Sequence, residues 1–254
     1  ETKYVYDTKN RLVSYTDPEG RTETYTYDCN SNLTKTVDKN GNTLKNTYDN
    51  QNRLTERTAK EKKTGKETVH TYRYNAYGDV AVQDDTQFVY GDVSGQVTKE
   101  TTKLTKNKDV VKNYTYDSKG NKSTFSVKAG EDTKLSLSYE YDGSSRLISV
   151  KDSEGNRAVS YAYDTEGSLS ERQAANGLKT TYGYDYQNRL TSMTNETGKG
   201  VVSKYSSTYL KNGQKAEEVS TVMDKNGKST KKTAAYTYDM LGRITRETKT
   251  GRED

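Results

Sequence analysis

The chain has 254 residues, of which 29% are hydrophobic and 30% are charged, a balance that favours disorder in an ordinary sequence. Its 23 tyrosines provide large rings with polar tips, and they favour a thin, partly wet, sheet-like core instead. One cysteine and one histidine exclude an internal disulfide, a cysteine-based zinc cluster and most histidine catalysis, so we expect no cofactor and no metal.

The formal net charge is +5, and both signs are interspersed along the chain. Residues 60–66 are locally rich in lysine, but no basic block is of the kind that follows a phosphate backbone, and we predict no nucleic-acid partner. No apolar run reaches membrane-spanning length, which predicts no membrane insertion by this segment. Residues 1–7 already lie inside a repeat and show no signal-peptide pattern, so we expect a fragment of a longer chain.

A Tyr-Asp dipeptide returns along the chain, usually followed within a few residues by Gly or Asn, Arg and Leu. Most returns are 21 to 29 residues apart, and one is 16 residues apart. Such self-similarity is typical of repeat proteins, in which each unit buries its apolar face against its neighbours. The motif tyrosines are Tyr6, Tyr27, Tyr48, Tyr116, Tyr141, Tyr163, Tyr184 and Tyr238, with weaker copies at Tyr74, Tyr90 and Tyr209.

Residues 24–38 show what one unit contains. Tyr25 and Tyr27 are two residues apart and share one face of a strand, and Leu33, Lys35 and Val37 share a face of the next run. Between these runs stands Asp-x-x-Gly/Asn, in which Asp accepts hydrogen bonds from backbone amides of a type I turn and the fourth residue tolerates a positive φ. Each unit is therefore predicted to hold two strands and two tight turns.

A second set of turns of the same design closes the other end of each unit, at residues 17–20, 38–41, 152–155 and 224–227. The longer intervals at residues 57–70, 101–113 and 193–232 are predicted to hold longer loops or extended hairpins. Strands joined by tight turns run antiparallel to their neighbours. We therefore predict an all-β fold, a single long antiparallel meander of about 20 strands that is strongly twisted or curved, in one domain of residues 1–254 with about 11 units.

The full pattern, Tyr-x-Tyr-Asp-x-x-Gly/Asn-Arg-Leu, resembles the YD-repeat, or Rhs, family over nearly the whole chain. Good copies begin at Tyr25, Tyr139, Tyr182 and Tyr236. The predicted structural signature of the repeat comprises Tyr6, Asp7, Tyr25, Tyr27, Asp28, Tyr48, Asp49, Tyr114, Tyr116, Asp117, Gly120, Tyr139, Tyr141, Asp142, Tyr161, Tyr163, Asp164, Gly167, Tyr182, Tyr184, Asp185, Tyr236, Tyr238, Asp239 and Gly242.

The resemblance implies a sheet wound into a spiral shell segment, as in bacterial polymorphic toxins, toxin complexes and teneurins. It implies a secreted or cell-surface, non-catalytic segment that encloses and delivers a C-terminal toxin or effector polypeptide from the same parent chain. We see no self-cleaving segment and no non-repetitive tail, so we expect this segment to form part of the shell wall and not the enclosed polypeptide. Self-association through open strand edges is a further expectation.

An alternative function is an extracellular adhesion or glycan-binding module that uses the tyrosine-rich face. Periodic tyrosines more often pack between strands. Tyr15, Tyr77, Tyr186 and Tyr205 fall outside the paired slots, and we select Tyr77 and Tyr186 as candidate ligand contacts. We expect no catalytic residue: the acidic pair at residues 84–85 fits a solvated loop, Cys29 fits a turn, and His70 fits a strand edge.

The turns at residues 38–41 and 224–227 also raise the question of calcium, because each offers two oxygen-bearing side chains and a glycine. A calcium loop needs six or more oxygen ligands, and lysine stands at alternate positions here. Turn formation accounts for these residues without a metal.

Overall fold

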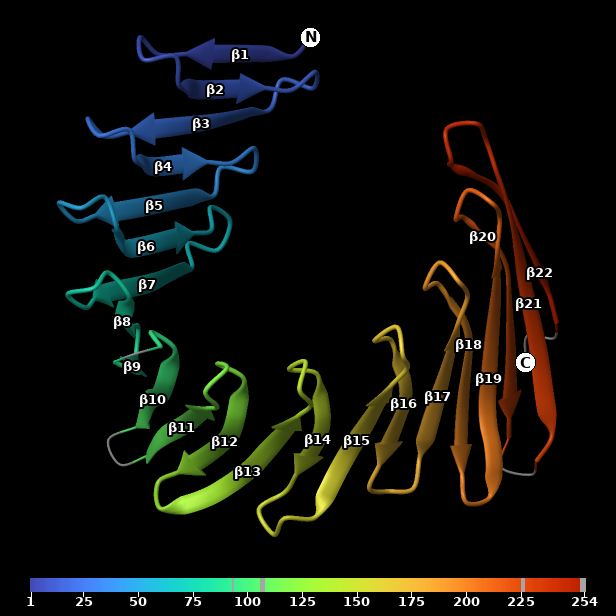
Figure 1. Cartoon of the computed structure of the whole chain (residues 1–254). Helices are drawn as coiled ribbons and strands as arrows, with labels where there is room; N and C mark the ends of the chain where they lie inside the picture. The colour runs from blue at the N-terminus through green and yellow to red at the C-terminus, as the bar shows by residue number, and fades with distance from the viewer. Residues whose placement is uncertain (93, 106–107, 225–226, 252–254) are drawn as a thin grey trace. The chain divides into compact units, whose positions relative to one another are not determined.

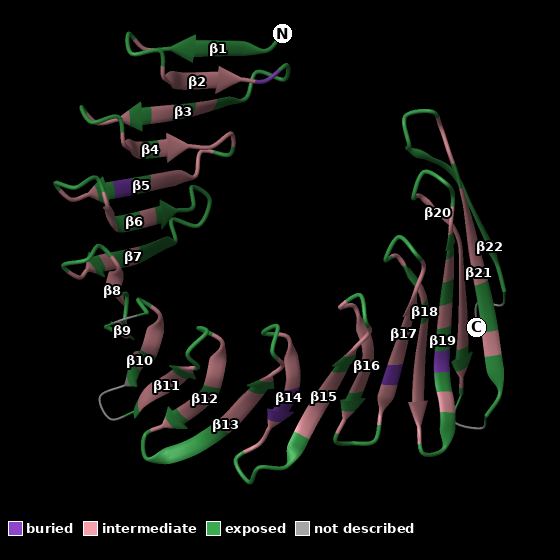
Figure 2. Ribbon diagram, viewed as in Figure 1, coloured by how far each residue is buried: buried purple, intermediate pink, exposed green. Residues whose placement is uncertain are grey.

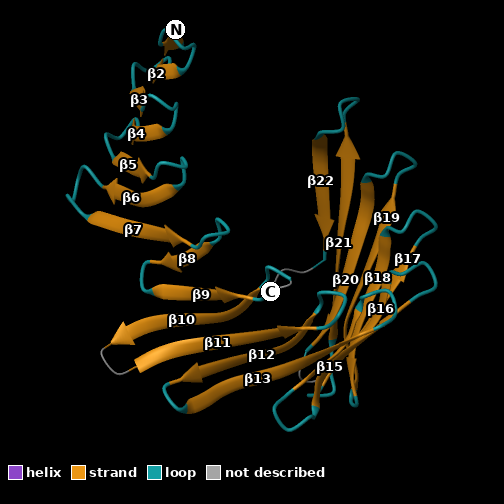
Figure 3. Cartoon of the chain, turned by 60° about the vertical axis from the view of Figure 1, so that its left-hand side comes forward, coloured by secondary structure: helices purple, strands orange, loops and turns teal. Residues whose placement is uncertain are grey.

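The computed structural model describes residues 1–92, 94–105, 108–224 and 227–251. Within these ranges the chain forms 22 strands and no helix (Figure 1, Figure 3). The predicted all-β antiparallel meander of about 20 strands is therefore confirmed. None of the described residues forms a helix with the length and apolarity needed to cross a membrane.

The chain divides into two compact units, which are described separately below. The first consists of Glu1–Tyr114 and Val127–Lys134, and the second of Thr115–Ser126 and Leu135–Asp254. Three strands contain residues of both units: β11 (Lys108–Tyr116), β12 (Lys122–Ala129) and β13 (Asp132–Tyr141). A single repeat domain over residues 1–254 stays a prediction.

In the first unit, each strand from β1 to β10 pairs antiparallel with the next strand in the chain. Short connections make this order the natural one, because a tight turn can only return the chain beside the strand it has left. The strands are β1 (Lys3–Tyr6), β2 (Leu12–Thr16), β3 (Thr22–Tyr27), β4 (Leu33–Val37), β5 (Thr43–Tyr48), β6 (Leu54–Lys60), β7 (Glu67–Tyr74), β8 (Val80–Gln83), β9 (Thr86–Tyr90) and β10 (Val97–Thr105).

In the second unit, the strands from β13 to β22 pair in the same sequential and antiparallel way. The remaining strands are β14 (Leu147–Lys151), β15 (Arg157–Tyr163), β16 (Leu169–Ala174), β17 (Lys179–Tyr184), β18 (Leu190–Thr197), β19 (Gly200–Tyr209), β20 (Lys215–Met223), β21 (Ser229–Tyr238) and β22 (Ile244–Thr250).

The longer intervals hold extended hairpins rather than long loops. Strands β10 and β11 have 9 residues each, and β19 and β21 have 10 residues each. The β6–β7 ladder continues to the pair Lys60↔Glu67, so the lysine-rich residues 61–66 form only its connection. The threonine-rich sequence between the motifs therefore forms longer strands, because threonine has a high strand propensity.

The tyrosine face predicted for β3 is confirmed, because Tyr25 and Tyr27 are half-buried while Thr24 and Thr26 are exposed. Strand β4 lacks this alternation, and only Lys35 in it is exposed. Figure 2 shows intermediate and exposed residues along the strands of both units. Among the described residues Val150, at 9% exposure, is the only buried apolar side chain, so hydrogen bonding and partial burial of tyrosine rings must supply most of the order.

Candidate functional site: the motif turns

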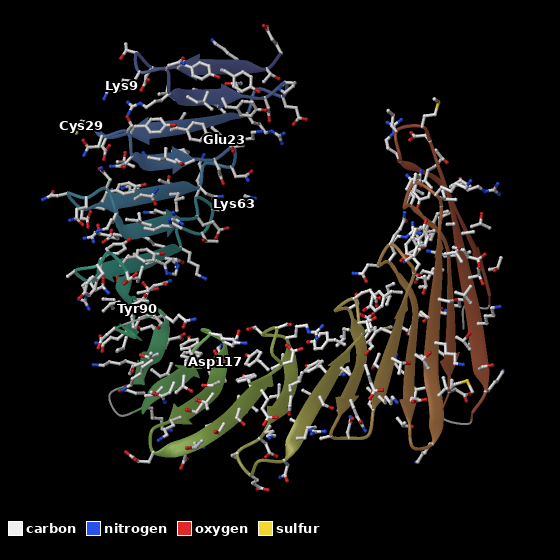
Figure 4. All side chains as sticks on the ribbon, in the orientation of Figure 1. Lys9, Glu23, Cys29, Lys63, Tyr90 and Asp117 are labelled. Atoms are coloured by element: carbon white, nitrogen blue, oxygen red, sulfur yellow. The ribbon has the colours of Figure 1, made fainter. Side chains whose placement is uncertain are left out.

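The functional candidates of this chain are the turns that follow the motif tyrosines, which we call the motif turns. Because successive strands alternate in direction, the motif turns of each unit all lie at the same ends of its strands. This row of strand ends is the edge of the sheet referred to below. They begin at Asp7, Asp28, Asp49, Asn75, Gly91, Asp117, Asp142, Asp164, Asp185, Leu210 and Asp239. In Figure 4, Lys9 and Cys29 mark this edge in the first unit, and Glu23 and Lys63 lie toward the opposite edge.

The turn at Asp185 shows the shared geometry. Asn188 N–H donates to Asp185 C=O at 2.9 Å, and Asp185 N–H donates to Arg189 C=O at 3.0 Å. Asn188 has a φ of 60°, and the ladder register shifts beside Tyr184. This is a type I turn followed by a left-handed residue and a bulge at the arginine, a common three-residue hairpin loop. The predicted positive φ at the fourth position is confirmed at Asn10, Gly20, Ser31, Gly41, Asn52, Gly120, Ser145, Gly155, Gly167, Asn188, Gly227 and Gly242.

The aspartate side chain organises its turn. Asp185 Oδ1 accepts from Gln187 N–H at 2.9 Å and from Arg189 N–H at 3.0 Å, while Oδ2 accepts from Arg189 Nε at 2.7 Å. Arg189 Nη2 also lies 2.6 Å from Oδ2, so two guanidinium nitrogens face the same carboxylate oxygen in a charge-assisted contact. The same aspartate–arginine pair closes the turns at Asp7, Asp49, Asp142 and Asp239.

These hydrogen bonds favour the ionised carboxylate. The side chain of Arg189 lowers the pKa of Asp185, and its backbone and that of Gln187 contribute as well. At the opposite end of the units, Asp17 is only 4% exposed. Burial opposes ionisation there, but bonds from Arg21 and Lys39 outweigh it and lower the pKa of Asp17 to about 2. The carboxylates of Asp17 and Asp185 therefore stay charged well below neutral pH.

In at least nine copies the second tyrosine links its own hairpin to the preceding one. Tyr184 Oη donates to the carbonyl of Leu169 at 2.9 Å, and Tyr163 Oη donates to that of Leu147 at 2.8 Å. The weaker copies keep this bond, because Tyr74, Tyr90 and Tyr209 donate to Leu54, Val80 and Leu190. The same bond is made by Tyr27, Tyr48, Tyr141 and Tyr238.

The arginine of one motif turn covers the tyrosine ring of the next copy. Arg189 lies 4.7 Å from the ring centroid of Tyr209, within the range of a cation–π interaction. Equivalent contacts at 4.5 to 4.6 Å join Arg11 to Tyr27, Arg53 to Tyr74 and Arg146 to Tyr163. We call this arrangement the Asp–Arg–Tyr link, and it joins each such turn to the next copy.

Further bonds connect successive turns. Arg11 Nη1 donates to Asp28 C=O at 3.1 Å, and Lys9 Nζ donates to Cys29 C=O at 2.9 Å. Where arginine is replaced, a polar side chain makes the connection: Asn121 donates to Ser145 Oγ, and Ser168 donates to Asn188 Oδ1. Polar contacts thus connect the motif turns of the second unit from Asp117 to Asp239, and those of the first unit from Asp7 to Asn75. Such a series of contacts can hold a thin sheet rigid.

The candidate ligand contacts lie at two turn tips. The side chains of Tyr77 and Tyr186 are 93% and 92% exposed, whereas Tyr15 and Tyr205 are half-buried in strands. Contact between Tyr77 or Tyr186 and a glycan stays a prediction. His70 Nδ1 lies 2.8 Å from Asp84 Oδ2, so the acidic pair at residues 84–85 forms a turn beside the histidine.

No group of three or more His, Cys, Asp or Glu side chains suited to a metal occurs in the described part of the chain. Asp38 is engaged by Asn40 and Asn42 within its own turn. Residues 225–226 of the second turn considered for calcium lie outside the described residues. The structure therefore supplies a turn-forming role for the Asp38 carboxylate.

The repeat pattern includes arginine but does not predict its partner. The signal was present in the fixed spacing, since arginine stands four residues after aspartate at positions 11, 53, 146, 189 and 243. A residue at that distance closes the turn and faces the carboxylate. Its contact with a tyrosine of the next copy could not be derived from the spacing alone.

Two family models match this chain: the RHS Repeat model over residues 6–43 and the Teneurin YD-shell model over residues 98–254. No curated protein matches. A crystal structure of TcdB2-TccC3-TEV resembles the chain with a TM-score of 0.70 at 12% identity, over 98% of this chain and 16% of that one. A structure of TcdB2-TccC3 without its hypervariable C-terminal region gives 0.64 at 13% identity, with the same coverage.

The chain thus spans 16% of the length of these solved chains, and at such low identity they establish the fold alone. The Teneurin YD-shell model covers more than half of the chain, a range that includes the aspartate turns and linked tyrosines of the second unit. The chain belongs to the Teneurin YD-shell family.

Proposed function

We propose that this chain is a wall segment of a secreted or cell-surface shell, which encloses a C-terminal toxin or effector polypeptide of the same parent chain and delivers it. The observation that carries the proposal is the Asp–Arg–Tyr link. It gives a single-layered sheet rigidity through polar contacts at its edge, with almost no apolar core. A wall of this kind needs no second layer to cover either face.

The polarity of the sheet faces supports containment. In the described part of the chain only a few large apolar residues outside turns are more than half exposed, such as Leu104 at 63% and Val89 at 51%. A contiguous apolar surface would hold an incompletely folded polypeptide tightly, whereas threonine, lysine and tyrosine hydroxyls offer weak, exchangeable contacts. The solved neighbours add support, since TcdB2-TccC3 has a hypervariable C-terminal region, which one of the solved chains lacks.

Protease protection of the parent polypeptide tests the proposal. A specific protease site would be placed in the segment expected as cargo, and a second copy in an exposed motif turn such as residues 239–242 would serve as a control. We expect the turn site to be cut in native buffer and the cargo site to be cut only after unfolding in urea. Equal cleavage of both sites in native buffer would rule out enclosure.

A second candidate function, adhesion through glycans, is favoured by the exposure of Tyr77 and Tyr186. Exposed aromatic rings at turn tips can stack on sugar rings without rearrangement of the sheet. Glycan-array binding of the 254-residue chain should weaken when both tyrosines become alanine. Substitution of the half-buried Tyr15 by phenylalanine is the matched control, and the absence of binding to any glycan would refute this function.

A further inference from the structure

The motif turn at residues 75–79 differs from the aspartate–arginine turns in the placement of its charge. Asn75 opens it in place of aspartate, and Asp79 stands where the other motif turns carry Arg, Asn, Gln or Ser. The backbone geometry is kept, because Asn75 Oδ1 accepts from the N–H groups of Tyr77 and Asp79 at 2.9 Å each. Asn75 Nδ2 donates to Asp79 Oδ2 at 3.1 Å. The turn therefore has a carboxylate and no guanidinium.

The tyrosine of the next copy is uncovered as a result. Tyr90 still donates its hydroxyl to Val80 C=O at 2.9 Å, the same bond that other motif tyrosines make to the strand after the preceding turn. Among the described residues no lysine or arginine lies over this ring, in contrast to the rings of Tyr27, Tyr74 and Tyr163. In the described part of the chain the Asp–Arg–Tyr link is thus absent after residue 79, as it is after Asn32 and Ser168, but at residue 79 a carboxylate stands in the place of the arginine.

A pocket of about 580 Å³ lies at this interruption, within the first unit. Its lining includes Asn75, Asp79, Phe88, Tyr90 and Gly91. These residues correspond to the surroundings of an arginine in a complete link: around Arg11 they are Asp7, the ring of Tyr27 and the carbonyl of Asp28, which accepts from Arg11 Nη1 at 3.1 Å. Gly91 follows Tyr90 as Asp28 follows Tyr27.

The charge of the pocket matches a cation. Asp79 and Asp92 both line it, and no lysine or arginine is among its lining residues. Burial, and after it the negative charge of Asp79, raises the pKa of Tyr90, which agrees with a carboxylate placed near the ring. Every complete link balances its carboxylate with a guanidinium, whereas this pocket leaves the charge of Asp79 without one.

We propose that the pocket between Asp79 and Tyr90 binds the guanidinium group of an arginine side chain presented by another polypeptide. The guanidinium stacks on the ring of Tyr90 and donates to the carboxylate of Asp79, in the position that Arg11 or Arg53 occupies in a complete link. Arginine fits better than lysine, because its planar fork can stack and donate to two acceptors together. This site goes beyond a wall function and does not depend on which polypeptide the shell encloses.

Binding is tested on the 254-residue chain with N-acetyl-arginine amide as the probe, followed by amide chemical shifts in NMR titrations. We expect shifts centred on Asp79, Tyr90 and Gly91, and at least tenfold weaker binding of N-acetyl-citrulline amide, a neutral analogue of the same shape. Equal binding of the two probes, or shifts spread evenly over the motif turns, would overturn the proposal.

Two variants make the test specific. Asp79→Asn should weaken binding at least tenfold, while Glu166→Gln, which removes the same charge from an exposed motif turn of the second unit, should not. The double variant Asn75→Asp with Asp79→Arg restores the motif within the chain, so it should abolish probe binding and raise the melting temperature. A double variant that still binds the probe with unchanged affinity would refute the assignment, whatever the folding of Asp79→Asn.

Discussion

Three side chains hold each complete link, and each has a separate task. Aspartate shapes its own turn, arginine neutralises it and covers the next ring, and tyrosine donates back to the preceding hairpin. The ion pair lies at the surface but is partly buried, with side-chain exposures of 22% for Arg189 and 18% for Asp185. The planar stacking and the two nitrogens that face the carboxylate make arginine hard to replace by lysine. The tyrosine hydroxyl is the member that can be removed with the smallest change in shape.

Removal of the hydroxyl of Tyr184 should therefore destabilise the chain measurably. Tyr184→Phe leaves the carbonyl of Leu169 without its donor at 2.9 Å, a loss of about 0.5–1.5 kcal/mol in the free energy of unfolding. Tyr182→Phe is the matched control, because Tyr182 shares the strand and the face but its hydroxyl has no hydrogen-bond partner among the described residues. Urea unfolding measures both variants, and an equal effect would contradict the assigned bond.

At the scale of the element, the hairpin is specified by its turn more than by its strands. The strands vary from 4 to 10 residues, yet the turn geometry is the same at Asp7, Asp142 and Asp239. The left-handed residue before the closing arginine sets the bulge and hence the register of the pair. Steric strain at that residue should consequently affect stability more than a change at the turn tip.

Two glycines in the second unit distinguish the effect of strain at the left-handed residue from the effect of a change at the turn tip. Gly155 has a φ of +82°, and a Cβ added there would meet nothing within 4 Å, so Gly155→Ala should cost about 1–2 kcal/mol through backbone strain alone. Gly143 also has open space but no positive φ, and Gly143→Ala should be neutral or stabilise by about 0.4–1 kcal/mol. Thermal unfolding of both variants measures the difference, and the opposite order would contradict the turn assignment.

At the scale of the whole molecule, the structure depends on contacts between successive hairpins instead of a common core. Only one apolar side chain is buried among the described residues, while the ladders and the links join neighbours in the chain. Stability should then be close to a sum of unit and neighbour contributions. The many turn aspartates contribute together, so pH is the condition that acts on all units at once.

Acid should lower the stability of the folded chain within a defined pH range. The carboxyl groups of Asp7, Asp28, Asp49, Asp142 and Asp239 all have a lowered pKa, and that of Asp17 falls to about 2. In the unfolded chain the pKa of these groups is about 3.9, so on acidification the unfolded state binds protons at a higher pH than the folded state does. The urea midpoint should be constant from pH 7 to about 5 and fall steadily between about pH 4 and 2.

Asp17→Asn provides the check on this acid effect. The variant should be less stable at neutral pH, because Arg21 and Lys39 lose a charged partner, and its midpoint should fall less between pH 4 and 2. Glu19→Gln, next to it but 70% exposed in its side chain, should retain the acid response of the unchanged chain. A midpoint that does not change down to pH 2 would show that the turn carboxylates contribute no stability.

The sequence by itself determined the strands, the turns and the family, because each rests on residues within about five positions of one another. Asp142 and Arg146 meet wherever the chain turns, and Tyr139 and Tyr141 share a face in any strand. Only the tertiary structure decided that Arg146 covers Tyr163 and that Tyr77 is exposed while Tyr15 is not. Contacts over 15 to 24 residues depend on strand length and register, and these vary from unit to unit. The pocket beside Asp79 was likewise decided by the tertiary structure, because it forms between the turn at Asp79 and the ring of Tyr90 in a different strand.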